Sequence, residues 1–224
     1  MFKNKKFFFK KKILIYGLGK TGLSSYYFLK KYNDLILFDD NKITNKKYPK
    51  RFFLSINKIK KVKFDYILIS PGININKCKL RKFLKKNLRK IITDLDVFYC
   101  KNYNNKIIAI TGTNGKSTTA HLTYLILKKQ NKDARLCGNI GNPILLEKKI
   151  SKKTIFVVEV SSYQIEYSKF FKANFAIILN ISPDHLERHR SMKNYIDAKF
   201  KLIKNQSKGG FAFINEKDKY LKNR

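Results

Sequence analysis

Short apolar runs recur along the chain, separated by glycine-rich or polar loops and by longer stretches with helical character. Runs that are almost continuously apolar are typical of strands buried in a parallel sheet. We expect strands at 13–16, 35–38, 66–69, 90–93, 154–160, 175–179 and 211–214, and one more that begins at 107. We expect helices that end near 32, 99 and 130, and helices over 77–87 and 192–205. This alternation predicts an α/β fold.

One apolar run ends in the sequence GTNGKSTT, which opens the next helix. Gly112 and Gly115 would let the backbone approach a polyphosphate, whose oxygens the unpaired N–H groups of a helix start can bind. Lys116 would add a positive charge, and Ser117 or Thr118 would offer a hydroxyl to magnesium. A plain glycine turn is the weaker interpretation, because the lysine and the paired hydroxyls are all in place.

Glycines also follow the first strand, where Gly17, Gly19 and Gly22 form the pattern G-x-G-x-x-G. The second strand ends in Asp39 and Asp40, where a Rossmann-like unit carries an acid that contacts a ribose hydroxyl. The pattern alone favours a dinucleotide-dependent oxidoreductase or a tight turn without a ligand, and both interpretations stay open at this point.

The polar segment KNYNNK at 101–106 resembles a linker. We divide the chain into a Rossmann-like N-terminal domain at 1–93 and a P-loop-type α/β central domain at 94–224, which includes the short helix before the linker. Loops at the carboxyl ends of parallel strands bind ligands in such folds, which draws attention to the SPG turn at 70–72.

Polar side chains also follow two later strands. Glu159 interrupts the apolar run TIFVVEV, and a buried acid is costly unless it is paired or bound to a cation, so the position favours magnesium. A salt bridge with one of the many lysines is the alternative. After the next strand, NISPDHLERH places Asp184, His185 and Arg188 at the expected active edge.

Two further segments hold polar candidates. The segment 135–143, RLCGNIGNP, is predicted to be a loop because it is rich in Gly and Asn, and its Asn139 is available to a ligand. Lys199 belongs to the helix predicted over 192–205, and from composition alone it is one lysine among many on a solvated face.

The charge balance is extreme, with 50 Lys and Arg residues against 15 Asp and Glu. A nucleic-acid or anionic-surface partner therefore has to be considered. The lysines are spread along every segment, without the clustered aromatic and basic residues that a nucleic-acid-binding ATPase would need. We interpret the charge as compositional drift and expect no nucleic-acid partner.

The cysteines and the N-terminal segment bear on localisation. Cys78, Cys100 and Cys137 show neither metal-ligand spacing nor a disulfide framework, which fits a reducing cytosol. The basic start MFKNKKFFFKKK contains an apolar run too short for a signal peptide, and no later stretch is long enough to span a membrane. We expect a cytoplasmic protein without a membrane partner.

Several motifs together resemble the ATP-dependent Mur ligases of peptidoglycan synthesis, in that family's order: GLGKTGLS, SPGI, ITGTNGKST, GNIGNP, VEVSSYQIE, NISPDHLERH and YIDAKF. The resemblance covers essentially the whole chain and implies ATP, Mg²⁺ and a monomer. VEVSSYQIE and DHLERH are most similar to the members that join D-glutamate to UDP-N-acetylmuramoyl-L-alanine. They argue against members that add a diamino acid and against the related enzyme that glutamylates folate.

The resemblance implies that the first domain holds a UDP-sugar and not NAD. The implied substrate contacts are Lys20, Thr21, Asp39, Asp40, Ser70, Gly72, Asn139 and His185. The implied ATP contacts are Gly112, Thr113, Asn114, Gly115, Lys116, Ser117 and Thr118. Ser117 and Glu159 would hold one magnesium ion, and His185 with a carbamylated Lys199 would hold a second. The implied catalytic residues are Lys116, Asn139, Asp184, His185, Arg188 and Lys199.

The implied reaction begins with transfer of the γ-phosphate to the alanyl carboxylate. The amine of D-glutamate then attacks the acyl phosphate. Full family members are longer than this chain, because they complete the central domain and add a C-terminal domain with part of the ATP site and the D-glutamate site. We therefore expect an incomplete central domain here and no C-terminal ligase domain. A non-catalytic remnant that binds UDP-sugar or ATP, or another Mur-type amino-acid ligase, remains the alternative.

Overall fold

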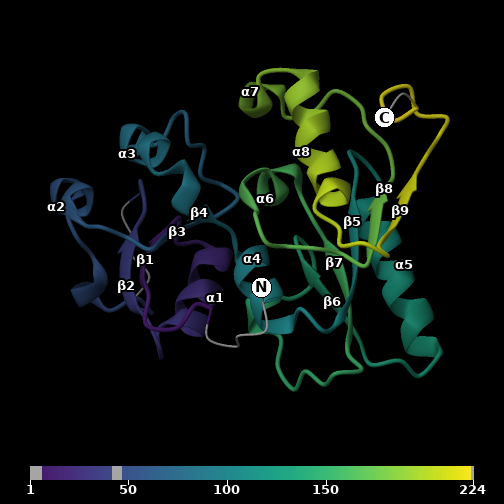
Figure 1. The fold of residues 1–224 in the computed structure, drawn as a ribbon, viewed down its shortest axis with the longest axis horizontal. Coiled ribbons are helices and arrows are strands. Elements are labelled where there is room, and N and C mark those ends of the chain that lie inside the picture. Colours follow the sequence, from purple (N-terminus) through teal and green to yellow (C-terminus); the bar gives the residue numbers. More distant parts are fainter. Residues whose placement is uncertain (1–6, 42–46, 223–224) are drawn as a thin grey trace.

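A computed structural model describes residues 7–41 and 47–222, and it contains two parallel sheets that lie side by side (Figure 1). The first sheet has the order β2-β1-β3-β4, with strands β1 (Lys12–Tyr16), β2 (Asp34–Phe38), β3 (Tyr66–Ile69) and β4 (Ile91–Ile92). The second has the order β6-β7-β5-β8-β9, with β5 (Lys106–Thr111), β6 (Ala134–Gly138), β7 (Ile155–Glu159), β8 (Phe175–Ile178) and β9 (Phe211–Ile214). The predicted α/β class is confirmed.

Eight α-helices connect or flank these strands within the described residues. They are α1 (Lys20–Leu29), α2 (Ile56–Lys61), α3 (Arg81–Lys86), α4 (Asp94–Asn102), α5 (Lys116–Lys129), α6 (Ser162–Tyr167), α7 (Leu186–His189) and α8 (Met192–Lys204). Single 3₁₀ turns lie at Lys50–Phe52, Leu88–Lys90 and Ile144–Leu146. The helices that begin at the carboxyl ends of β1 and β5 are the two that the glycine motifs predict.

Helices α5 and α8 cover opposite faces of the second sheet, because successive residues of a strand point to opposite sides. Ile110 of β5 packs with Ala120 of α5, whereas the preceding residue, Ala109, belongs to the core that contains Leu202 of α8. The carboxyl ends of β5, β7 and β8 therefore lie between two helices that both carry predicted site residues.

The segment 135–143, predicted to be a loop, is a strand in its first part. β6 pairs with β7 from Ala134 to Gly138, and Ala134 and Cys137 are buried against the core. Its glycines and asparagines indicated a loop, but those residues begin only where the strand ends. Packing of the apolar positions before them decides the structure.

Two predicted helix boundaries also move. α3 begins at Arg81 in place of Lys77, since 75–80 forms turns. α4 continues to Asn102, so only 103–105 separates it from β5 and the expected linker is mostly regular structure. Met1–Lys6 of the basic start lies outside the described residues.

The junction between the sheets is organised by Asp96 of α4, which is completely buried. Its carboxylate accepts hydrogen bonds from Ser168 Oγ at 2.7 Å and from the backbone N–H groups of Lys169 and Phe170 at 2.8 and 2.7 Å. It also closes a capping box with Thr93 at the start of α4. One apolar core runs across this junction, and the division of the chain at 93 and 94 stays a prediction.

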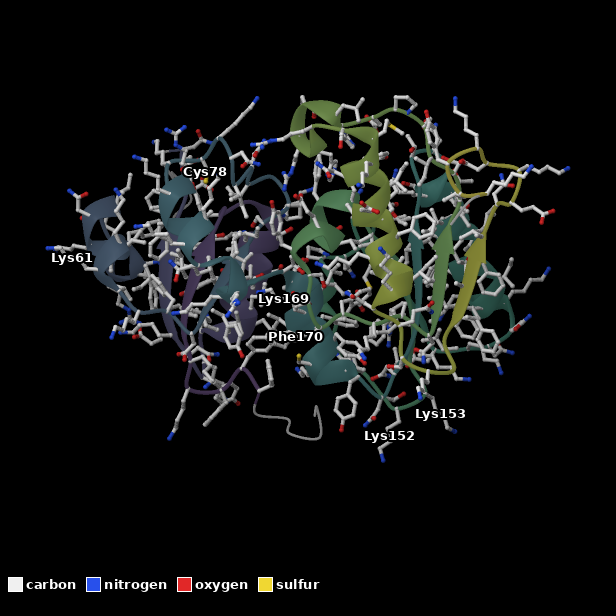
Figure 2. All side chains as sticks on the ribbon, turned by 45° about the horizontal axis from the view of Figure 1, so that its top comes forward. Lys61, Cys78, Lys152, Lys153, Lys169 and Phe170 are labelled. Carbon is white, nitrogen blue, oxygen red and sulfur yellow. The ribbon has the colours of Figure 1, made fainter. Side chains whose placement is uncertain are left out.

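The basic side chains are distributed over the surface, as the sequence indicates. Figure 2 shows Lys61 at one side of the molecule and the adjacent Lys152 and Lys153 at another, and all three are exposed. Within 7–41 and 47–222, no helix is both long and apolar enough to cross a membrane.

Candidate functional site

The loop between β5 and α5, residues 112–115, has the shape that the glycine motif predicts, and we call it the phosphate loop. Gly115 has a φ of +78°, a left-handed value that side chains with a Cβ rarely adopt, and Gly112 has a φ of +156°. A Cβ on Gly112 would lie 3.1 Å from the Cβ of Leu179. α5 begins directly after Gly115, so the unpaired N–H groups of its first turn face the loop.

Residues 113 and 114 of this loop are bound to the segment after β8. The Thr113 N–H donates to the Asn180 carbonyl at 3.0 Å, and the Asn114 N–H donates to Asn180 Oδ1 at 2.9 Å. Lys116 Nζ donates to the Thr113 carbonyl at 2.7 Å. The lysine therefore folds back over its own loop, where a bound phosphate would compete for its charge.

Glu159 lies at the carboxyl end of β7 with 1% of its surface exposed. Oε2 accepts a hydrogen bond from Ser117 Oγ, and Oε1 accepts one from Asn139 Nδ2, both at 2.7 Å. These partners are neutral, so they offset the desolvation of the carboxylate only in part. A buried carboxylate beside a hydroxyl and an amide is an oxygen-rich set that fits a magnesium ion.

Lys199 of α8 is buried with 2% of its surface exposed. Its amine donates to the Gly112 carbonyl at 2.7 Å and lies 4.6 Å from the centre of the Tyr195 ring. Burial and the charge of Lys116 lower the pKa of Lys199 to about 7, against an opposing effect of Asp184. An ammonium group does not ligate a cation, whereas a lowered pKa makes the neutral, nucleophilic amine accessible near neutral pH.

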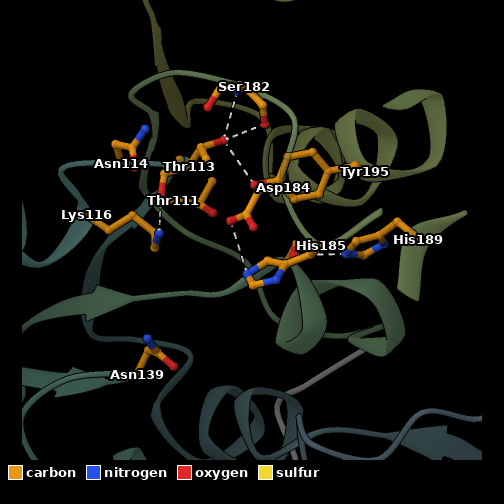
Figure 3. Close-up of polar contacts among 12 residues, drawn as sticks. Thr111, Thr113, Asn114, Lys116, Asn139, Ser182, Asp184, His185, His189 and Tyr195 are labelled. Carbon is orange, nitrogen blue, oxygen red and sulfur yellow. Dashed lines mark hydrogen bonds and ion pairs between the residues drawn. The ribbon is translucent and has the colours of Figure 1, made fainter. Parts of the chain in front are cut away.

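Asp184 and His185 follow β8, as predicted, and form an ion-pair contact at 3.3 Å between Oδ2 and Nε2. His185 has a φ of +54°, which turns its ring toward Tyr163, with ring centres 4.8 Å apart. Figure 3 shows this pair beside the phosphate loop, with Asn139 set apart from both. Asn139 follows β6 and contacts Glu159, whereas His185 follows β8. The two predicted substrate-facing residues therefore approach the site from different strands.

Arg188 connects the two halves of the chain. Its Nη1 donates to the carbonyl of Pro71 at 2.5 Å, its guanidinium lies 4.0 Å from the centre of the Tyr163 ring, and its Nε lies 3.7 Å from Glu166 Oε2. Pro71 belongs to the SPG turn after β3. The predicted ordering residue therefore contacts the loop predicted to hold the UDP-sugar.

His189 is a buried core histidine. Its Nε2 lies 3.0 Å from Ser162 Oγ, and its ring packs 5.3 Å from the ring of Tyr195. Burial and the neighbouring charges of Arg188 and Lys199 lower the pKa of His189 to about 4. This histidine is neutral at neutral pH and supports the site by packing.

The first sheet places its predicted residues around the glycine turn. Asp39 Oδ2 accepts from the Leu18 N–H at 2.6 Å, and Asp40 Oδ1 accepts from the Tyr16 hydroxyl at 2.5 Å. Ser70 Oγ donates to the carbonyl of Gly17 at 2.6 Å. Asp39 and Ser70 therefore contact the turn itself, whereas Asp40 contacts the last residue of β1.

The other three predicted UDP-sugar residues lie at the same edge. Lys20 and Thr21 occupy the first turn of α1, where the Thr21 carbonyl accepts from the hydroxyls of Ser24 and Ser25 at 2.8 Å. Lys20 and Gly72 are exposed, and Thr21 is half-buried.

Sequence reasoning missed Ser182 and Tyr195, both of which contact the phosphate loop. Tyr195 OH lies 3.0 Å from Thr113 Oγ1, which also accepts from the Ser182 N–H at 3.0 Å. Tyr195 sits four residues before Lys199, so both side chains share one face of α8, and this spacing was the available signal. Among residues 7–41 and 47–222, no group of three or more His, Cys, Asp or Glu could hold a metal ion.

Comparison with known proteins gives a match to the Mur ligase middle domain over residues 110–224. The chain is 38% identical to a UDP-N-acetylmuramoylalanine-D-glutamate ligase of Rickettsia bellii, over 94% of this chain and 47% of the relative. It is 38% identical to the same enzyme of Caldicellulosiruptor bescii, over 92% and 47%. The chain spans about half the length of the curated relatives that it matches.

Two solved structures share the fold. The UDP-N-acetylmuramate:L-alanyl-gamma-D-glutamyl-meso-diaminopimelate ligase of Neisseria meningitides aligns with a TM-score of 0.59 and 14% identity, over 96% of this chain and 74% of that chain. The UDP-N-acetylmuramate-alanine ligase of Thermotoga maritima aligns with a TM-score of 0.54 and 20% identity, over 95% and 51%.

Proposed function

Because the chain belongs to the Mur ligase family, we propose that it forms the UDP-sugar-binding and ATP-binding parts of a ligase that joins D-glutamate to UDP-N-acetylmuramoyl-L-alanine. Mur ligases depend on ATP. The observation that carries this assignment within the family is the identity of 38% over more than nine-tenths of the chain to ligases of that name. The proposed place of action is the cytoplasm, and the proposed assembly is a monomer.

In this proposal, the phosphate loop and Lys116 bind ATP, and Ser117 and Glu159 hold a magnesium ion. Bound magnesium would neutralise charge between the β- and γ-phosphates and so let the substrate carboxylate approach. The carboxylate of Glu159 supports this role because its two hydrogen-bond partners are neutral.

A second proposed ion would use His185 and a carbamylated Lys199. Carbamylation forms a bond between Nζ of the neutral amine and the carbon of CO₂, releases one proton, and converts the side chain into an anionic oxygen ligand. A buried amine with a pKa near 7 supports this modification. Lys199 would have to leave the Gly112 carbonyl, to which it now donates.

The remaining residues would align the two anionic reactants. His185 and Asn139 would face the alanyl end of the substrate, Asp184 would orient His185, and Arg188 would fix the turn after β3. Alignment of a bound carboxylate with the γ-phosphate accounts for a large part of such catalysis. The acyl phosphate then reacts with the amine of D-glutamate, which other parts of a full-length ligase would bind.

Calorimetric titration with UDP-N-acetylmuramoyl-L-alanine, and separately with NADH, tests the proposal. We expect the UDP-sugar to bind and NADH not to bind. An Asp39→Ala and Asp40→Ala double variant should lose UDP-sugar binding and keep Mg·ADP binding, which shows that it still folds. Binding of NADH, or of neither ligand, would overturn the assignment of the first domain.

Two alternatives use the same residues. A remnant without catalysis would bind UDP-sugar and ATP but form no ADP and no inorganic phosphate in the presence of D-glutamate. Another Mur-type ligase would accept a different amino acid. Product analysis with D-glutamate and with a diamino acid separates these possibilities.

A further inference from the structure

Several backbone groups of the phosphate loop are hydrogen-bonded to the segment after β8. Asn180 accepts the N–H of Thr113 with its carbonyl and the N–H of Asn114 with Oδ1, and its Nδ2 donates to the Asn114 carbonyl at 3.1 Å. The side-chain amide therefore pairs with both backbone groups of Asn114, as a neighbouring strand would.

The hydroxyl of Thr113 is occupied as well. Its Oγ1 accepts from the Ser182 N–H at 3.0 Å, lies 3.3 Å from the Ser182 carbonyl, and lies 3.0 Å from Tyr195 OH. A hydroxyl can donate once and accept twice, so these contacts use its full capacity when the phenol donates. Figure 3 shows Thr113 between Ser182 and Tyr195.

These contacts leave a defined set of donors for a phosphate. The N–H groups of Thr113 and Asn114 point to Asn180, whereas the first N–H groups of α5 have no acceptor within the helix. They belong to Lys116, Ser117 and Thr118, next to the N-cap Gly115. Hence the fixed part of the loop uses its own N–H groups internally, and the N–H groups of the helix start stay available to a ligand.

We propose that Asn180 and Tyr195 are positioning residues that hold residues 113 and 114 of the phosphate loop and so confine phosphate contacts to residues 115–118. Tyr195 is buried, with 1% of its surface exposed, and its ring also lies under the Lys199 amine. The same side chain therefore fixes the loop from α8, while Asn180 fixes it from β8. The inference rests on the proposed function, because it assumes that the loop binds a polyphosphate.

Calorimetric titration of the full chain with Mg·ADP, and with tripolyphosphate as a ligand without a base, tests the inference. Asn180→Ala and Tyr195→Phe should each weaken both ligands by about tenfold, since a loop free to move loses alignment with the helix start. Tyr32→Phe, at an exposed tyrosine of the first half, should change neither. UDP affinity and the melting temperature should stay close to wild type in Tyr195→Phe.

A double-mutant cycle separates positioning from general loss of stability. Thr113→Val removes the hydroxyl that Tyr195 contacts, so Tyr195→Phe should have no further effect on ADP affinity in that background. If the wild type binds Mg·ADP, two results would overturn the inference. One is an additive effect of Thr113→Val and Tyr195→Phe on ADP affinity, and the other is wild-type ADP affinity in both Asn180→Ala and Tyr195→Phe. If the wild type binds neither Mg·ADP nor tripolyphosphate, the proposed function fails as well.

Discussion

Glu159 illustrates how one residue in an apolar run acquires chemistry from its neighbours. It is the last residue of β7, whose other residues are all apolar. Its partners Ser117 and Asn139 come from α5 and from the turn after β6. An isolated buried carboxylate is expensive, and neutral hydrogen bonds reduce that cost without removing it. A divalent cation would offset it most directly.

We expect Glu159→Gln to reduce the gain in ADP affinity that Mg²⁺ provides by about tenfold or more. The amide keeps the size of the side chain but removes the negative charge. Titrations with ADP in magnesium and in EDTA measure this gain. Glu216→Gln, at an exposed glutamate, is the matched control and should behave as wild type. An unchanged magnesium effect in Glu159→Gln would exclude Glu159 as a ligand.

The sequence predicted Glu159 and the phosphate loop because their side chains are unusual for their positions. Ser182 gave no signal, since a serine in a loop is an ordinary residue. The spacing between Tyr195 and Lys199 places both on one face of a helix but does not show what that face contacts. The role of Ser182 and Tyr195 depends on the distance between α8 and the loop after β5, which only tertiary packing sets. The same limit applies to Arg188, whose contact with Pro71 joins segments far apart in the chain.

At the scale of elements, α4 links the two sheets and carries a buried acid that is only partly hydrogen-bonded. Asp94, in the first turn of α4, is 3% exposed, and its Oδ1 has no hydrogen-bond partner. Burial, with a smaller effect of the Asp96 charge, raises the pKa of Asp94 from 3.8 to about 6. In the folded chain the carboxyl therefore holds its proton more tightly than in the unfolded chain.

This pKa shift makes stability depend on pH. Between about pH 3.8 and pH 6 the folded state binds more protons than the unfolded state, so Asp94 lowers stability as the pH rises, and the penalty is complete above pH 6. Asp94→Asn should stabilise the chain at pH 7 by about 1–3 kcal/mol and should give no such gain below about pH 4. Urea unfolding at both values measures this difference. An equal effect at the two pH values would contradict it.

β6 shows where element prediction from sequence failed. Its fully buried positions, Ala134 and Cys137, are too few and too close to the glycines for a clear strand pattern, and pairing with β7 makes it a strand. In contrast, β9 coincides with its predicted range at 211–214 because a compact apolar run is bounded by glycines and a polar tail.

For the whole molecule, the contact between Arg188 and Pro71 connects the predicted UDP-sugar loop to the residues after β8. The guanidinium also stacks on Tyr163, which packs against His185. A planar guanidinium can donate a hydrogen bond to Pro71 and stack on Tyr163 at the same time, which an ammonium group cannot do. In the proposed function, alignment between the two ligands would depend on this side chain.

We expect Arg188→Lys to weaken binding of UDP-N-acetylmuramoyl-L-alanine by about tenfold and to leave Mg·ADP affinity unchanged, because the turn after β3 loses its anchor whereas residues 113 and 114 keep their contacts with Asn180, Ser182 and Tyr195. Arg190→Lys, at the exposed neighbouring arginine, is the control. Calorimetry with each ligand measures the difference. Equal losses for both ligands would indicate a general loss of structure.

The central claim is that the loop between β5 and α5 binds a magnesium nucleotide while the first sheet binds a UDP-sugar. The most direct test titrates ADP, with and without Mg²⁺, into the chain before and after saturation with UDP-N-acetylmuramoyl-L-alanine. The account predicts one magnesium-dependent ADP site that persists when the UDP-sugar is bound and is lost in Lys116→Ala. Competition between ADP and the UDP-sugar for one site would contradict it. An ADP affinity that changes neither with Mg²⁺ nor in Lys116→Ala would contradict it as well.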